Sequence, residues 1–269
     1  MFCITLKFDI MTVLRNQTIA IYVINLDRSF DRLAQITASL IAQQLSYERI
    51  KAVDGQMATH EQLLKLDESE YKKLHGKTPV PGELGCYLSH LAAIQQFAVS
   101  SKPFAVILED DAIIHDNFGE VINKLTTCSE AWDMVKLSGI HSGSLARVIS
   151  VDVNHDLCVM FTRCTGASAY IINKRAAKAY LQHLLPMALP FDHEFDKGWK
   201  YKLQVLAVKP FPVTHNEIIT TTICTPSRVS RKLPAYKRLS TYKYRLNNEL
   251  ARFIYALFLV IKVKVRLFI

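Results

Sequence analysis

The sequence predicts an α/β fold in which helices cover both faces of a mostly parallel sheet. Residues 19–24 are apolar and β-branched, residues 30–44 space their apolar side chains as one face of a helix, and residues 47–53 resemble a second short strand. A strand, a helix and a strand in about 35 residues form the unit that builds parallel sheets. Residues 106–108 are an apolar run that is too short for a helix and therefore indicates a buried strand.

The elements after residue 53 continue this alternation. Thr59 is a typical N-cap and predicts a polar helix to about residue 73, followed by a loop rich in glycine and proline at 76–82. Leu84, Leu88, Leu91 and Ile94 lie on one face of a predicted helix over 83–99. The later predictions are a strand over 103–108, a helix over 116–125, a strand over 132–137, a hairpin over 147–161, a strand over 167–172, a helix over 174–185, a short helix opening at 190–194 and a strand over 203–208.

Composition and charge limit the classes of function. Half of the 269 residues are hydrophobic, so the chain can bury a full core and is not disordered. The net charge is +9, but residues 228–269 contain eleven Lys or Arg against the single acid Glu249, so residues 1–227 carry a net charge of −1. The basic character therefore belongs to a C-terminal segment, and we expect no nucleic-acid-binding surface on the body of the protein.

The cysteines predict a reducing environment. Six are scattered along the chain with no CxxC pair and no metal-ligand spacing, so we expect reduced thiols and a cytoplasmic location. Residues 1–18 are interpreted as an N-terminal extension without the pattern of a secretory signal. Residues 19–227 form the predicted catalytic domain.

Three consecutive acids, Glu109, Asp110 and Asp111, follow the predicted strand over 103–108. Ligands of open α/β sheets bind at the carboxyl ends of the strands, and adjacent carboxylates repel one another unless a cation or solvent relieves them. We therefore interpret the cluster as a site for Mg²⁺ or Mn²⁺, held by Glu109 and Asp111 or by Asp110 and Asp111. The alternative is a solvated acidic turn.

Other polar residues are candidates for the same edge of the sheet. Asn25, Asp27 and Arg28 end the first strand and could hold a ribose hydroxyl and a diphosphate, or form an ordinary polar loop. The chain contains neither GxGxxG nor GxxxxGK[ST], which disfavours a dinucleotide fold and a P-loop. His215 follows a late strand and is a candidate third metal or phosphate ligand.

No nucleophile–base pair is apparent in the sequence. Ser89 and His90 are adjacent, so on a helix their side chains point about 100° apart. Asp192 and Glu194 follow Pro190 at a predicted helix start, where either could act as a general base or simply cap the helix.

The C-terminal segment, residues 228–269, combines basic and apolar residues. Residues 253–261 are nine consecutive apolar or aromatic residues, fewer than the about 20 that span a bilayer. The combination favours a segment that lies in an anionic membrane surface. A helix packed on the domain with a solvated basic face is the alternative.

Taken together, the sequence resembles glycosyltransferase family 25, of the bacterial lipooligosaccharide galactosyltransferase type. The segments that carry the resemblance keep their order over roughly residues 19–215. They are IYVINLDRS at 21–29, GELGCYLSH at 82–90, VILEDD at 106–111, WDMVKL at 132–137, TGASAYII at 165–172 and PFD at 190–192.

The resemblance implies a GT-A-like nucleotide-sugar-binding domain and an inverting transfer of a hexose, most often galactose, from a UDP-sugar. Glu109-Asp110-Asp111 would replace the Asp-x-Asp metal motif and hold Mn²⁺ or Mg²⁺. Asp192 would be the general base, with Glu194 behind it. Asn25, Asp27 and Arg28 would line the nucleotide pocket, and Glu83 and His90 its neighbouring wall.

The resemblance also implies the partners. The acceptor would be a lipid-linked lipooligosaccharide or LPS core, reached from the inner face of the cytoplasmic membrane, to which the C-terminal segment would bind peripherally. Two other functions stay open at this point. They are a metal-dependent nucleotide-sugar hydrolase that uses the same carboxylates, and a non-enzymatic peripheral membrane-binding protein.

Overall fold

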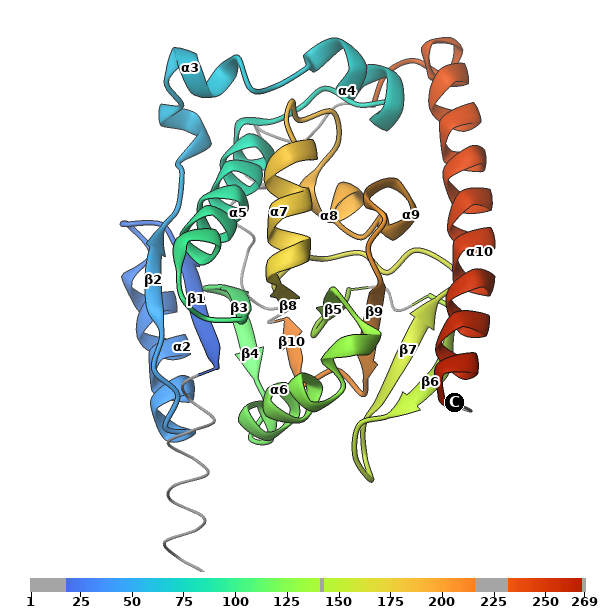
Figure 1. Cartoon of the computed structure of the whole chain (residues 1–269). Coiled ribbons are helices and arrows are strands. Elements are labelled where there is room, and N and C mark those ends of the chain that lie inside the picture. Colours follow the sequence, from blue (N-terminus) through green and yellow to red (C-terminus); the bar gives the residue numbers. More distant parts are fainter. Residues whose placement is uncertain (1–17, 141–142, 216–231, 268–269) are drawn as a thin grey trace, which may run out of the picture.

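The computed structural model describes residues 18–140, 143–215 and 232–267 (Figure 1). Most of the N-terminal extension, and Arg228 and Arg231 of the basic segment, lie outside these residues. The central sheet has eight strands: β1 (Ile19–Asn25), β2 (Glu48–Lys51), β3 (Phe104–Glu109), β5 (Met134–Lys136), β6 (Leu145–Ser150), β7 (Asp156–Met160), β8 (Ala169–Asn173) and β9 (Val205–Lys209).

The strand order is β2-β1-β3-β8-β5-β9-β7-β6. All strands except β7 and β8 run in one direction, so the prediction of a mostly parallel sheet is confirmed. The expected hairpin over 147–161 is β6 and β7. A small second sheet pairs β4 (Ala112–Ile114) with β10 (Val213–His215). Of the three acids, Glu109 is the last residue of β3, and Asp110 and Asp111 form the turn to β4.

Side chains of successive strand residues point to opposite faces of the sheet and build two cores. Tyr22 and Ile24 of β1 face one core, whereas Ile21 and Val23 face the other. The first core packs against α5 (Pro81–Val99), α7 (Lys174–His183) and α8 (Phe191–Glu194), and the second against α2 (Phe30–Ala42), α6 (Phe118–Thr127) and the C-terminal helix. Burial on both faces explains why the strands read as continuous apolar runs.

One predicted helix is divided in the structure. The segment expected to be one helix from Thr59 forms α3 (His60–Leu63) and α4 (Glu68–His75). Thr59 caps α3 as expected, but the Asp67 side chain accepts a hydrogen bond from the Glu70 amide and begins a second helix. A short helix, α9 (Gly198–Tyr201), also precedes β9.

The start of α5 lies against the loop after β2 because two glycines allow close contact. A Cβ atom on Gly85 would lie 2.5 Å from the carbonyl oxygen of Val53, and one on Gly55 would overlap the carbonyl oxygen of Pro81. These contacts bring the first turn of α5 to the carboxyl edge of the sheet, where the acidic turn also lies.

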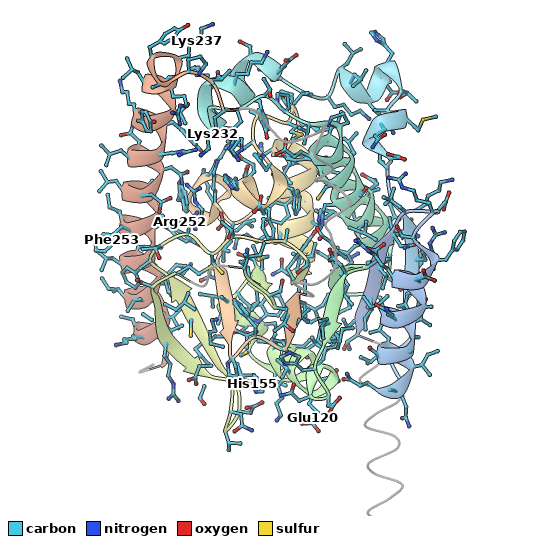
Figure 2. The ribbon with its side chains drawn as sticks, turned by 180° about the vertical axis from the view of Figure 1, so that it is seen from behind. Glu120, His155, Lys232, Lys237, Arg252 and Phe253 are labelled. Carbon is cyan, nitrogen blue, oxygen red and sulfur yellow. The ribbon has the colours of Figure 1, made fainter. Side chains whose placement is uncertain are left out.

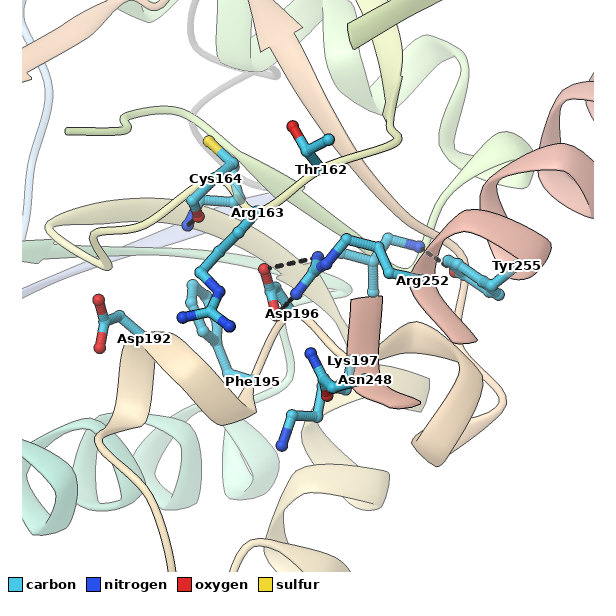
Figure 3. Close-up of polar contacts among 12 residues, drawn as sticks. Thr162, Arg163, Cys164, Asp192, Phe195, Asp196, Lys197, Asn248, Arg252 and Tyr255 are labelled. Carbon is cyan, nitrogen blue, oxygen red and sulfur yellow. Dashed lines mark hydrogen bonds and ion pairs between the residues drawn. The ribbon is translucent and has the colours of Figure 1, made fainter. Parts of the chain in front are cut away.

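The C-terminal segment forms a single helix, α10 (Leu239–Leu267), which runs along one side of the molecule (Figure 1). Ala256, Leu259 and Val263 are buried in the second core. The inward face also carries Arg252, whose guanidinium donates two hydrogen bonds to the buried Asp196 carboxylate, at 3.0 and 3.1 Å (Figure 3). One face of the segment therefore packs on the domain, as in the second of the two alternatives that the sequence allowed.

Within the described ranges, no helix combines the length and the apolarity needed to cross a bilayer.

Removing Arg252 should strongly destabilise the fold. Arg252→Ala leaves Asp196 charged, buried and unpaired, which should lower the free energy of unfolding by about 3–5 kcal/mol in a urea titration. Lys243→Ala, an exposed position on the same helix, should change it by less than about 0.5 kcal/mol. Equal effects of the two substitutions would contradict a stabilising role for the buried pair.

Candidate active site

A pocket of about 410 Å³ lies at the carboxyl ends of β1 and β3. Its walls come from the loops after β1 and β2, the first turns of α5, the β3–β4 turn, the loop before β8 and the start of α8. The volume falls within the range of small-molecule sites, and the position is the usual ligand edge of an α/β sheet. The elements that the sequence suggested for a site therefore meet at one pocket.

The three acids of the β3–β4 turn have different partners. Asp110 accepts hydrogen bonds from the Asn25 amide at 2.7 Å and from Arg32 at 3.5 Å. Glu109 lies 3.0 Å from His90 Nε2. Asp111 lies 3.9 Å from Arg32 through one oxygen, while its other oxygen, Oδ1, is buried and has no hydrogen-bond partner in the described part of the chain.

These surroundings disfavour ionisation of Asp111. Burial, and then the neighbouring charges of Glu109 and Asp110, raise the pKa of Asp111 to about 7. Burial also raises the pKa of Asp110. A partnerless buried oxygen beside two further carboxylates fits a divalent cation that prefers oxygen ligands, such as Mn²⁺ or Mg²⁺. All three acids line the pocket, but Asp110 is already bound by Asn25 and Arg32, so Asp111 and Glu109 are the best placed to hold one.

A second group of metal-ligand types adjoins the acidic turn. One side-chain ligand atom each from Cys86, His90 and Glu109 lies within 4.8 Å of the others. Burial, and then Glu109, raise the pKa of the Cys86 thiol well above its usual range, so the thiol stays protonated and donates to Glu109 at 3.7 Å. Thiol and imidazole ligands suit softer ions than Mn²⁺ or Mg²⁺. We therefore interpret Cys86 and His90 as groups that orient Glu109.

His90 is itself held in place from two sides. Its Nδ1 lies 3.1 Å from the Tyr170 hydroxyl, and its ring stacks on Phe191 with centroids 4.1 Å apart. Phe191 is the first residue of α8 and immediately precedes Asp192. The β3–β4 turn and α8 are thus fixed relative to each other through one histidine.

Asp192 lies on the α8 wall of the pocket. Its Oδ2 accepts a hydrogen bond from the Gly166 amide at 3.2 Å. Gly166 has a φ of +92°, which a side chain rarely tolerates, and its carbonyl oxygen is bound by the buried Lys136 ammonium group. Glu83, on the α5 wall, accepts hydrogen bonds from the Val80 amide at 2.9 Å and the Tyr71 hydroxyl at 2.8 Å.

Three candidate residues, Asn25, Asp27 and Glu194, lie away from the pocket lining. The Asn25 amide donates a hydrogen bond to Asp110. Asp27 is exposed and pairs with basic side chains of β2. Glu194 is buried, and its oxygens are bound by Lys197, Lys200 and Tyr201, so it anchors the end of α8. His215 ends β10, and its side chain lies outside the described residues.

Burial and neighbouring charges also shift the pKa values of Glu194 and His75. Burial alone would raise the pKa of Glu194, but Lys197 and Lys200 outweigh burial and lower it. Burial, and then nearby positive groups, lower the pKa of the pocket residue His75 to about 3. His75 is therefore neutral at physiological pH.

Arg32 is the main site residue that the sequence analysis missed. It lines the pocket and contacts both Asp110 and Asp111. It lies in the first turn of α2, and Arg28, in the loop before this helix, is also in the lining. Together they place positive charge beside the acidic turn.

The pocket is lined by acids and lies at the carboxyl edge of an α/β sheet, which is where α/β proteins bind their ligands. Residues 18–195 match the family model described as glycosyltransferase family 25 (LPS biosynthesis protein), and the chain belongs to this family. The resemblance inferred from the sequence is therefore confirmed.

Individual relatives are distant. The human inactive glycosyltransferase 25 family member 3 is 29% identical over 125 residues, which cover 44% of this chain and 21% of that protein. Human procollagen galactosyltransferase 2 is 28% identical over 109 residues, 39% of this chain and 17% of that protein. The chain thus spans about a fifth of the length of these curated relatives.

A solved structure of a glycosyltransferase involved in the glycosylation of the major capsid of PBCV-1 aligns with a TM-score of 0.34 and 11% identity. The alignment covers 60% of this chain and 62% of that one.

The raised pKa of Asp111 predicts a pH-dependent stability. The pKa rises from 3.8 to about 7 on folding, so the contribution of this group to stability is complete below pH 3.8 and is lost as the pH rises through 7. Asp111→Asn cannot ionise. In metal-free buffer, the free energy of unfolding of the variant relative to the natural protein should increase by about 2 kcal/mol between pH 5 and pH 8.

Urea titrations of both proteins across this pH range measure that difference, in which titrating groups away from the acidic turn cancel. Asp116→Asn, at an exposed acid just after β4, is the control for the removal of a carboxylate outside the acidic turn. A pH-independent difference for Asp111→Asn would show that its carboxyl group is not perturbed.

Proposed function

We propose that this protein is an inverting glycosyltransferase that moves a hexose from a UDP-sugar to an acceptor hydroxyl. The observation that carries the proposal is the partnerless buried oxygen of Asp111, which lies with Glu109 in a pocket at the ligand edge of a family 25 fold. This arrangement suits a metal-bound diphosphate better than it suits a solvated acidic turn.

The charges of the pocket support a nucleotide diphosphate as the leaving group. Asp111 and Glu109 would hold the divalent cation, and Arg28 and Arg32 line the same part of the pocket. A bound Mn²⁺ or Mg²⁺ neutralises charge that develops on a diphosphate as it departs. Arg32 also keeps Asp110 and Asp111 partly compensated when they are ionised.

Asp192 is the proposed general base. Inversion takes place in one displacement, so it needs one group that accepts the proton of the acceptor hydroxyl and no covalent nucleophile. The Gly166 amide binds one oxygen of Asp192 and fixes the carboxylate at the pocket wall. Glu194, the other candidate base, has both oxygens occupied by Lys197, Lys200 and Tyr201.

The sugar and the acceptor are inferred from the family. Galactose is the proposed sugar, in line with the galactosyltransferase names of some relatives. The proposed acceptor is a lipooligosaccharide or LPS core, because the matching family model is described by LPS biosynthesis.

A donor screen tests the proposal. UDP release should be measured with UDP-galactose, UDP-glucose and UDP-N-acetylglucosamine, each with and without lipooligosaccharide acceptor and Mn²⁺. We expect release that requires both acceptor and Mn²⁺ and is fastest with UDP-galactose. Asp192→Asn should lower kcat by about 10²- to 10⁴-fold, because the acceptor loses its base.

The control variant is Asp116→Asn, which removes an exposed carboxylate outside the pocket lining and should leave the rate unchanged. UDP release that is equally fast without acceptor would identify a hydrolase instead. Full activity of Asp192→Asn would remove Asp192 from the mechanism.

A further inference from the structure

The outward side of α10 carries a long row of exposed apolar side chains. They recur every three or four residues, the spacing that places side chains on one face of a helix. The members of this apolar stripe are between 45% and 72% exposed: Leu239, Tyr242, Leu246, Leu250, Phe253, Ile254, Leu257, Phe258, Ile261 and Val265. Apolar patches of this extent on a folded protein mark interaction surfaces.

The stripe is distinct from the face that holds α10 on the domain. Arg252, Ala256, Leu259 and Val263 are buried on the opposite side, where the helix contacts α4, α9, β6 and β7. Figure 2 shows Phe253 on the outer side of α10 and Arg252 on its inner side. The apolar run at 253–261 therefore contributes to two faces of α10, and packing in the core accounts only for the inward one.

The charges on α10 and in the turn before it are mostly positive. Lys243 and Lys264 are exposed beside it, and Lys237 and Arg238 precede the helix. The single acid of α10, Glu249, pairs with Arg163 at 3.0 Å and lies 3.9 Å from Arg252. Apart from this paired acid, the charged side chains in the described part of α10 are cations. An apolar face among cations complements an anionic lipid surface, in which the lysine ammonium groups reach the headgroups and the apolar side chains enter the acyl boundary.

The dimensions also suit a helix that lies in the plane of a membrane. The 29 residues of α10 make a helix about 43 Å long, and the stripe runs along nearly all of it. The first turns of α10 lie next to the pocket, because Arg245 donates to the carbonyl oxygen of the pocket residue His75 at 3.1 Å. A membrane under the stripe would therefore be close to the pocket.

We propose that the outward face of α10 docks in the plane of a bilayer containing anionic lipid. The docked helix would hold the pocket near acceptors that are anchored in the same bilayer, and this second statement rests on the proposed function.

Vesicle sedimentation tests the docking. The full chain is mixed with vesicles of pure phosphatidylcholine or of equal parts phosphatidylcholine and phosphatidylglycerol, without donor sugar, so the result is independent of any transfer activity. We expect binding to the anionic vesicles that weakens as salt is added. The double variant Leu246→Glu/Leu250→Glu should reduce this binding at least about tenfold.

Matched controls separate the stripe from a general effect of added charge. The exposed apolar residues Leu64 and Val153 lie elsewhere, and the double variant Leu64→Glu/Val153→Glu should bind as the natural protein does. Lys243→Glu should weaken binding to anionic vesicles, whereas Lys178→Glu, an exposed lysine on α7, should not. Circular dichroism of each variant verifies that it is folded.

Two results would overturn the proposal. One is unchanged vesicle binding by Leu246→Glu/Leu250→Glu. The other is no vesicle binding together with a dimer in size-exclusion chromatography that this variant dissociates, which would assign the stripe to a second copy of the chain.

Discussion

The repulsion among three adjacent carboxylates at the end of β3 is the constraint around which the site is built. The turn from Glu109 to Asp111 enters the pocket at the carboxyl edge of the sheet, where burial penalises charge. Surrounding elements compensate two of the acids: Asn25 and Arg32 bind Asp110, and His90 contacts Glu109. Asp111 is left only partly compensated, and its buried Oδ1 has no hydrogen-bond partner within the described ranges, which supports the proposed cation site.

The opposite wall of the pocket depends on a second set of buried charges. Asp192 is the second residue of α8. Glu194, at the end of this helix, binds Lys197 and Lys200, and the next buried acid, Asp196, pairs with Arg252 (Figure 3). Because Arg252 comes from α10, the C-terminal helix supports the position of the proposed base as well as carrying the apolar stripe. Catalysis and membrane docking would thus share one structural element.

The fold could be predicted largely from the sequence because its signals are local. The β-branched runs of β1 and β3 and the apolar face of α5 identify their elements without knowledge of the partners. The break between α3 and α4 was missed, since Asp67 looks like an ordinary polar residue until its capping bond is seen. The long row of apolar residues on α10 was also obscured, because residues 253–261 read as one apolar run although they face two ways.

The sequence predicted which residues form the site better than it predicted what each of them does. The position of the acids after a strand was enough to identify them as site residues. The role of each residue, however, depends on contacts between segments that are far apart in the sequence. Asn25 and Asp110 are 85 residues apart, and Glu194 looked as suitable a base as Asp192 until its lysine partners were visible. Arg32 was missed because a single arginine on a helix carries no signal of what it faces.

Calorimetry of UDP binding tests the central claim most directly. If Asp111 and Glu109 hold a cation that binds the diphosphate, UDP should bind at least about tenfold more tightly with Mn²⁺ than with EDTA, and Asp111→Asn should abolish this difference while Asp116→Asn retains it. UDP affinity that is the same with and without Mn²⁺, or that is unaffected by Asp111→Asn, would contradict the assignment of the acidic turn as a metal–diphosphate site.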